Sequence, residues 1–319
     1  MTATGPAAAA ESGPPPAPFR CASAARDRHD PQLGTAPQTR RWLLLEHRGP
    51  WQIDALAGSR LKPDVLELLT RTAQAQSARP LLIRRPGRSE ARSEQSWAVV
   101  YENGAVLWGR WRWDDDLRGA ADALAASPPE PDRVPAPLLL VCAHGLHDVC
   151  CALRGRPVAA ALAAEWPEAT WECSHVGGDR FAANLVVLPD GVYYGNLDAG
   201  SAVSVVQAHL AGEVAVEHLR GMTRVPPPAQ VAVAEVHRRY GPFAAGDVEV
   251  AVIDHASNGS WRIELTTPGA ASAVTVTIAA TRRRPAQLTC RAPGDTPAME
   301  YHVVDLTAAG DARTRAGQP

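Results

Sequence analysis

Residues 138–195 read LLLVCAHGLHDVCCALRGRPVAAALAAEWPEATWECSHVGGDRFAANLVVLPDGVYYG, and the interpretation of the whole chain starts from this stretch. Its apolar beginning, residues 138–142, predicts a buried strand. A helix is expected over residues 156–165 and a second strand over residues 170–173. Each strand runs directly into a loop that carries cysteine, histidine or aspartate. We therefore expect the two loops to meet at one end of a sheet.

Four of the six cysteines of the chain lie in this stretch, beside histidine and aspartate side chains. The potential ligands are Cys142, Cys150, Cys151, Cys173, His144, His147, His175 and Asp179. Sulfur, imidazole and carboxylate within reach of one another favour a soft-ligand metal site. Cys150 and Cys151 precede the expected helix, whose N-terminal dipole favours a thiolate. His144 and His147 are expected to be outer-shell donors or surface residues.

Three motifs of the stretch resemble a known family. They are C-x-H-G-x-x-D-x-x-C from Cys142, S-H-x-G-G-x-R-F-A-x-N from Ser174 and L-P-D-G-x-Y-Y-G from Leu188. Residues 136–215 closely resemble the sucrase/ferredoxin-like family, and residues 36–125 resemble it more weakly. The resemblance implies a thioredoxin-like domain that binds a [2Fe–2S] cluster as a ferredoxin does.

The resemblance also implies a set of cluster ligands. In eukaryotic relatives two cysteines and two histidines hold the cluster, and the histidines lie in an H-x-G-G-H run. Cys142, Cys151 and His175 match three of these positions, and Asp179 stands at the fourth. Cys173 is the alternative fourth ligand. It lies two residues before His175, and side chains two residues apart on a strand face the same side.

The remaining residues near the motifs are assigned supporting roles or none. Gly177 and Gly178 let the backbone approach a bulky cofactor and aim N–H groups at its sulfides. Cys150 is expected to point away from the cluster. Cys21 and Cys290 lie far from the motifs in sequence and are expected to take no part.

Composition narrows the class of protein. The net charge of −2 gives no reason to expect nucleic acid or an anionic membrane as partner. No run approaches about 20 apolar residues, and the N-terminus lacks the pattern of a signal peptide. Lys62 is the only lysine among 32 basic residues, which is typical of a GC-rich bacterial genome. We therefore expect a cytoplasmic location, where clustered thiols favour metal or redox chemistry over disulfides.

The expected fold class is α/β (α+β), with two thioredoxin-like units of the order β-α-β-β-β-α followed by a small α+β module. The predicted segments are a disordered N-terminal segment 1–19, a ligandless thioredoxin-like domain 20–126, a proline-rich linker 127–137, a thioredoxin-like ferredoxin domain 138–221, an α+β module 228–306 and a tail 307–319.

Paired letters support the duplication. LLLEH at residues 43–47 matches LLLVC at residues 138–142, and VVYENGAVLWG matches VVLPDGVYYG. Each of the latter holds a strong hairpin signal, Asn103-Gly104 or Asp190-Gly191. The first unit is expected to be ligandless, because residues 41–141 contain no cysteine.

The favoured function is one-electron transfer through a [2Fe–2S] cluster, with a redox partner protein, either a reductase or an electron acceptor. One alternative is a thiol-disulfide oxidoreductase on the same fold, although no C-x-x-C motif is present. Another is an interaction module stabilised by zinc. No substrate pocket can be identified from the sequence, so an electron-transfer role is favoured over an enzyme with its own substrate.

Overall fold

The computed structural model describes residues 18–87, 94–133, 136–268 and 273–308. A large sheet contains the strands β1 Arg41–Glu46, β2 Ala78–Arg84, β3 Gln95–Val100, β4 Val106–Trp111, β5 Leu138–Cys142, β6 Thr170–Cys173, β7 Leu185–Leu188, β8 Val192–Tyr194 and β9 Leu219–Met222. A smaller sheet contains β10 Glu249–His255, β11 Trp261–Thr266, β12 Val274–Arg282 and β13 Met299–Ala308.

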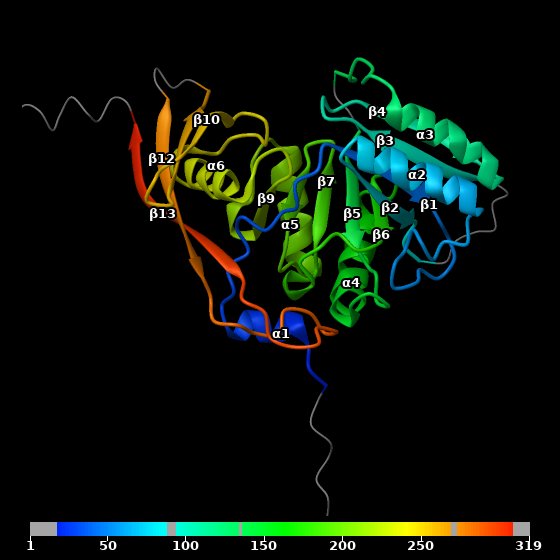
Figure 1. The fold of residues 1–319 in the computed structure, drawn as a ribbon, viewed down its shortest axis with the longest axis horizontal. Coiled ribbons are helices and arrows are strands. Elements are labelled where there is room, and N and C mark those ends of the chain that lie inside the picture. The colour runs from blue at the N-terminus through cyan, green and yellow to red at the C-terminus, as the bar shows by residue number, and fades with distance from the viewer. Residues whose placement is uncertain (1–17, 88–93, 134–135, 269–272, 309–319) are drawn as a thin grey trace, which may run out of the picture.

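The helices surround these sheets (Figure 1). They are α1 Cys21–Asp27, α2 Pro63–Ala75, α3 Arg118–Ala125, α4 Val149–Glu165, α5 Ala199–Leu210 and α6 Pro227–Tyr240, with short 3-10 helices η1 Asp114–Leu117, η2 Asp179–Phe181 and η3 Val216–His218. Within the described ranges, no helix has the length and apolar character needed to cross a bilayer. Most of the predicted tail and most of the predicted N-terminal segment lie outside the described residues, and residues 307–308 of the tail belong to β13.

The large sheet confirms the predicted order of elements. Its strand order is β4-β3-β1-β2-β6-β5-β7-β8-β9, and the smaller sheet runs β10-β11-β12-β13. In the first unit β1 is parallel to β2 and antiparallel to β3, and β3 is antiparallel to β4. In the second unit β5, β6, β7 and β8 repeat these directions. Both units therefore have the order β-α-β-β-β-α, and the fold is mixed α/β with a separate four-stranded sheet.

The sheet registers correct the residue match that the letters suggest. Val99 lies opposite Leu43, and Val187 lies opposite Leu139. All four side chains belong to the cores beneath the helices of their own units. Leu43 therefore corresponds to Leu139 and not to Leu138, because a slip of one residue turns a side chain to the other face of the sheet.

The same registers make Glu46 the counterpart of Cys142, and Ile83 the counterpart of Cys173. Glu46 pairs with Ile83 in the first unit, and Cys142 pairs with Cys173 in the second. Ile83 also pairs with Cys173 across the antiparallel contact of β2 with β6, which joins the units. The prediction that His47 occupies the Cys142 position was wrong by one residue.

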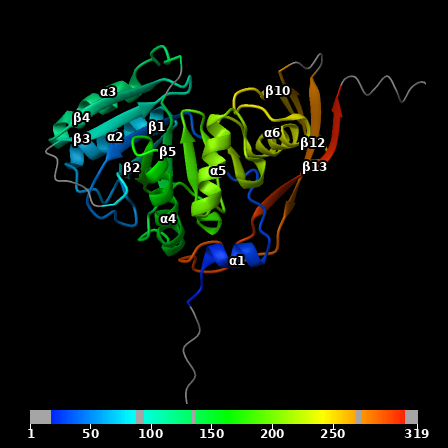
Figure 2. The ribbon, with the colours of Figure 1, turned by 180° about the vertical axis from the view of Figure 1, so that it is seen from behind.

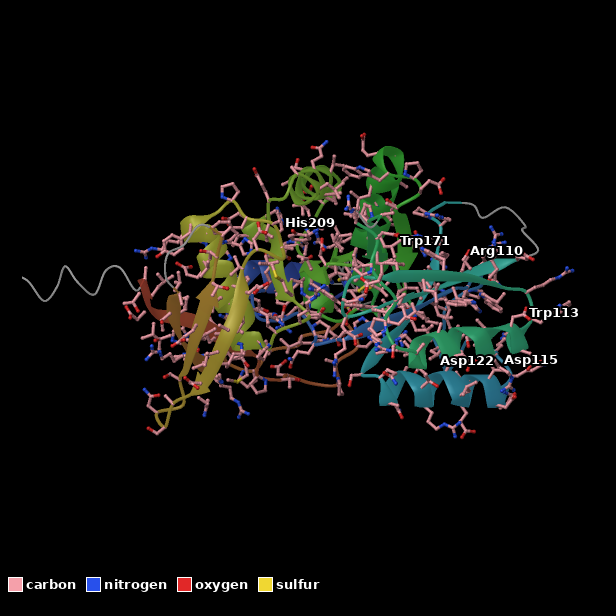
Figure 3. The ribbon with its side chains drawn as sticks, turned by 90° about the horizontal axis from the view of Figure 1, so that it is seen from above. Arg110, Trp113, Asp115, Asp122, Trp171 and His209 are labelled. Carbon is pink, nitrogen blue, oxygen red and sulfur yellow. The ribbon has the colours of Figure 1, made fainter. Side chains whose placement is uncertain are left out.

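The large sheet coils until its two halves face each other. Trp108 of β4 stacks on Trp171 of β6 with ring centroids 6.0 Å apart, although three strands separate β4 from β6 in the sheet. Between the halves lies one shared apolar core, which includes Leu44 and Leu140. Figure 3 shows Asp122 of α3 and His209 of α5 on opposite sides of the coiled sheet. The helices thus cover its outer faces.

The C-terminal module shares its core with the second unit. Buried residues of α6, β11 and β12 belong to the same apolar cluster as Leu139 and Val141 of β5. The alternating pattern of residues 286–291 predicts a strand, but these residues form a loop with a single bridge, Ala286 to Thr296. Strand β9, which extends the large sheet from β8, was not predicted.

Candidate metal centre

The predicted donors meet where β5 and β6 end. Cys142 is the last residue of β5, and His175 follows β6 by two residues. Cys151 lies in the first turn of α4. The ligand atoms of these three residues lie within 4.8 Å of one another. Two neighbouring parallel strands thus deliver their following loops to one edge, as the sequence indicates.

Helix α4 begins at Val149 and not at residue 156, so Cys150 and Cys151 lie inside the helix and not before it. Asp148 is the N-cap, and its side chain accepts a hydrogen bond of 2.8 Å from Cys150 N. Gly155 permits close packing of this helix on the end of β5, because a Cβ atom there would lie 2.1 Å from Cys142 O. The early helix start points Cys151 toward Cys142.

The loop from His175 to Asp179, here called the ligand loop, is held by buried polar contacts. Arg79 of β2 donates a hydrogen bond of 3.0 Å to His175 O, and Arg220 of β9 donates one of 2.9 Å to Gly177 O. Gly177 and Gly178 have φ values of +87° and +75°, which favour glycine. Neither arginine could be predicted, because no local pattern links them to the loop.

The fourth position lies beside Asp179. Its Oδ1 is 3.1 Å from Cys151 Sγ and 3.0 Å from His175 Nδ1. Cys173 is fully buried in the core shared by the two sheet halves. It belongs to none of the donor groups found within 4.8 Å among the described residues. The distances place Asp179, and not Cys173, next to the other donors.

Hydrogen bonds, charges and burial set the protonation of these side chains. A hydrogen bond from Cys151 lowers the pKa of Cys142 well below its ordinary value, although burial opposes this. Burial lowers the pKa of His175, but contacts with Asp179 and Cys142 outweigh it and raise the pKa to about 9. Burial raises the pKa of Asp179, yet His175 and Cys151 together lower it. Thiolate is therefore favoured at Cys142 and carboxylate at Asp179. The hydrogen bond with Cys142 raises the pKa of Cys151, so Cys151 and His175 would each release a proton on binding a metal.

Two further histidines border the centre. His147 stacks on His175 with ring centroids 3.7 Å apart. His144 Nδ1 accepts a hydrogen bond of 3.3 Å from His175 N, and its other nitrogen lies 2.7 Å from Gln52 O. A cleft of about 580 Å³ opens beside these rings and is also lined by Ile53. One side of the centre is therefore accessible from solvent.

The donor set suits an iron–sulfur centre. Two thiol groups, an imidazole and a carboxylate converge, and thiolates with histidine are known ligands of [2Fe–2S] clusters. His175 Nδ1 is buried without an aligned hydrogen bond, although Asp179 Oδ1 is only 3.0 Å away. The Asp179 carboxylate favours a proton on the imidazole, and this proton would have to leave before the nitrogen could bind a metal.

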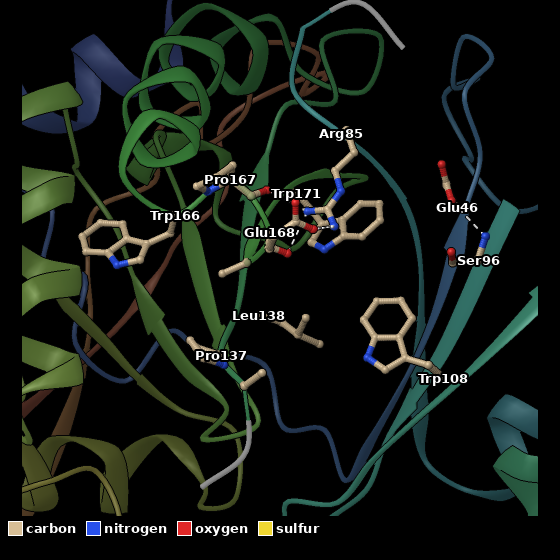
Figure 4. Close-up of a pocket in the computed structure, with 12 residues that line it drawn as sticks. Glu46, Arg85, Ser96, Trp108, Pro137, Leu138, Trp166, Pro167, Glu168 and Trp171 are labelled. Carbon is tan, nitrogen blue, oxygen red and sulfur yellow. Dashed lines mark hydrogen bonds and ion pairs between the residues drawn. The ribbon is translucent and has the colours of Figure 1, made fainter. Parts of the chain in front are cut away.

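A second cleft, of about 540 Å³, lies at the opposite ends of β5 and β6 (Figure 4). Trp108 and Trp171 line it, and the Arg85 guanidinium lies 3.6 Å from the Trp171 ring centroid. Its lining residues include no cysteine or histidine. This cleft is therefore separate from the metal centre.

A family model described as sucrase/ferredoxin-like matches residues 32–221, which is more than half of the chain. The chain belongs to the sucrase/ferredoxin-like family. No curated protein and no solved structure matches it. The family match contains both β-α-β-β-β-α units and all the donors of the metal centre. It excludes α1, α6 and the four-stranded sheet.

Proposed function

We propose that the chain binds a [2Fe–2S] cluster through Cys142, Cys151, His175 and Asp179 and transfers single electrons. The observation that carries this proposal is the convergence of four donors from two loops beside an accessible cleft. The family membership supports it through the ferredoxin-like part of the family description. A cluster supplies one-electron redox chemistry when bound.

The cysteines of the proposed site are buried, whereas its histidines are partly exposed. Cys142 and Cys151 are each 1% exposed and would hold its buried side. The His175 side chain is 25% exposed, and the stacked His147 side chain is 32% exposed. Electrons would therefore enter and leave along the two imidazole rings. A redox partner protein, either a reductase or an acceptor, would dock over them.

Asp179 and the cysteines determine the expected redox potential. Replacing thiolate by neutral imidazole raises the potential of a cluster, and two histidines define the Rieske centres. With one histidine, the value should lie between roughly −400 and +300 mV. The negative charge of Asp179 should pull it toward the low end of that range.

Single substitutions test the ligand set. Cys142→Ser and Cys151→Ser should each abolish the visible absorption and the bound iron of anaerobically purified protein. Asp179→Ala should do the same or leave a labile cluster. Cys173→Ser is the matched control, because it changes another buried cysteine near the site and should leave the absorption unchanged. If Cys173→Ser lost the cluster and Asp179→Ala retained it, the fourth ligand would be Cys173 and not Asp179.

The same preparations test the competing functions. Zinc in place of iron at Cys142 and Cys151 would favour an interaction module stabilised by zinc. A metal-free protein with a reversible disulfide between these two residues would favour a thiol-disulfide oxidoreductase. All six cysteines are free thiols in the described structure, which is consistent with the reducing cytoplasm that we propose as its location.

A further inference from the structure

Three cysteines from distant parts of the chain meet on the far side of the α4 start. Cys21 begins α1, Cys150 lies in the first turn of α4, and Cys290 lies in the connection from β12 to β13. Cys290 Sγ is 3.5 Å from Cys150 Sγ and 3.5 Å from Cys21 Sγ. Figures 1 and 2 both show α1 beside the β12–β13 connection. Cys21 and Cys290, which lie far from the motifs in sequence, therefore belong to a group of potential donors.

A buried carboxylate completes the group. Asp148 is fully buried, and its two oxygens lie 3.6 and 3.5 Å from Cys21 Sγ. They also accept hydrogen bonds of 2.8 Å from Cys150 N and 2.7 Å from Cys290 N. One ligand atom from each of the four residues lies within 4.8 Å of all the others. The backbone contacts fix the orientation of the carboxylate toward the sulfur atoms.

The spacing matches a single tetrahedral ion. Zinc bonds of about 2.3 Å to sulfur and about 2.0 Å to oxygen place sulfur atoms about 3.8 Å apart and sulfur about 3.5 Å from oxygen. The observed distances from Cys290 to the other sulfurs, and from Cys21 to Asp148, are close to these values. A disulfide would hold two sulfur atoms about 2.05 Å apart. The sulfur atoms are therefore spaced as ligands of one ion would be, and not as the two sulfurs of a disulfide.

We propose that Cys21, Asp148, Cys150 and Cys290 bind one structural zinc ion. Three soft thiolates select zinc over magnesium or calcium, and four protein ligands leave no open position for catalysis. Arg26 and Arg180 lie close enough to interact electrostatically with Cys150 and Cys21, and so partly balance the excess negative charge.

The ion would connect three segments that are far apart along the chain. It would tie α1 and the C-terminal module to the second unit, while neither Cys21 nor Cys290 lies within the family match at residues 32–221. Adjacent Cys150 and Cys151 would then serve different sites, one structural and one redox-active. This zinc site does not depend on the proposed cluster.

Metal analysis of the full chain tests the site. Protein should be expressed with added zinc and purified with a reductant and without chelators. The wild type should contain about one zinc ion per chain. Cys21→Ala and Cys290→Ala should reduce zinc to background. Cys173→Ala and Cys142→Ser should keep it, because these residues lie outside the group.

Cobalt provides a second readout. Cys142→Ser protein stripped of metal, in which the proposed cluster site has lost a thiolate, should bind one equivalent of Co²⁺ and develop thiolate-to-cobalt charge-transfer absorption with the visible bands of tetrahedral cobalt. Wild-type protein with its thiols reduced that binds neither zinc nor cobalt would overturn the proposal. Zinc that survives Cys290→Ala but disappears in Cys142→Ser would also overturn it. An Asp148→Asn variant with unchanged zinc affinity would overturn the four-ligand assignment.

Discussion

Replacing Arg220 by methionine is expected to destabilise the protein and loosen the ligand loop. Arg220 is 1% exposed. It donates hydrogen bonds to three carbonyl oxygens, 2.9 Å to Gly177 O and to Asn184 Oδ1 and 2.8 Å to Thr35 O. A fourth, of 3.1 Å, goes to the Thr35 hydroxyl, which keeps a hydrogen bond to another residue. The side chain therefore connects the ligand loop to the segment that follows α1. Methionine fills much of the same apolar space but donates no hydrogen bond.

The magnitude follows from the acceptors that lose their donor. Each buried acceptor left without a partner costs about 1–3 kcal/mol, so three give roughly 3–9 kcal/mol. Part of this is offset, because burial of the guanidinium is itself unfavourable and lowers the pKa of Arg220 to about 10. The acceptors are neutral, so the substitution leaves no buried charge without a partner. We expect a loss of about 4 kcal/mol for Arg220→Met, near the low end of this range.

Urea unfolding of reduced protein, followed by tryptophan fluorescence and circular dichroism, measures this loss. Arg79→Met is the matched control, because it removes a half-buried arginine that donates one hydrogen bond to His175 O, and about 1 kcal/mol is expected. Arg220→Lys should recover no more than half of the loss, since one ammonium group cannot reach all three acceptors. A loss below about 1 kcal/mol in Arg220→Met, or equal losses in both methionine variants, would refute the reasoning.

Three further predictions concern the ligand loop, the C-terminal module and the proposed cluster. Gly178→Ala should lower metal retention more than Gly177→Ala, because both glycines have positive φ but only at Gly178 would a Cβ lie 2.3 Å from Arg220 Nη2; equal retention would contradict this. Burial lowers the pKa of His237 to about 4, so the unfolded state binds more protons between about pH 6.5 and 4. Stability should therefore fall by up to about 3 kcal/mol as the pH drops through this window, and His237→Phe should remove that part of the loss in urea midpoints; parallel curves for the two proteins would contradict it. The potential of the proposed cluster should shift by no more than about 59 mV per pH unit, because only His175 is an expected imidazole ligand; a steeper slope in a redox titration would require a second histidine ligand.

Local signals account for the parts of the fold that the sequence predicts. The Asn103-Gly104 turn has Gly104 at φ +91°, and Asn103 Oδ1 accepts a hydrogen bond from Ala105 N. The Asp190-Gly191 turn likewise has Gly191 at a φ of +70°. Such turns are encoded by neighbouring residues, as are alternating apolar strands. The convergence of the ligand loops also follows from local order, because parallel neighbouring strands end at the same edge.

Residues that act through distant contacts escaped prediction. The start of α4 was placed too late, because Gly155 and Pro157 resemble a helix boundary, whereas Gly155 permits close packing on β5. Cys21 and Cys290 are 269 positions apart, and only the folded chain brings their sulfur atoms together. The alignment of the two units was wrong by one residue. Both LLLEH and LLLVC begin with three leucines, so the letters do not show which leucine faces which side of the sheet. Tertiary packing, and not local pattern, decides each of these features.

The most direct test of the proposed function is the iron and acid-labile sulfide content of the full chain purified under anaerobic conditions. We predict about two irons and two sulfides per chain, with both lost in Cys142→Ser and both retained in Cys173→Ser. Protein that contains neither iron nor sulfide, and that cannot be reconstituted with them, would contradict the proposal that Cys142, Cys151, His175 and Asp179 hold a [2Fe–2S] cluster.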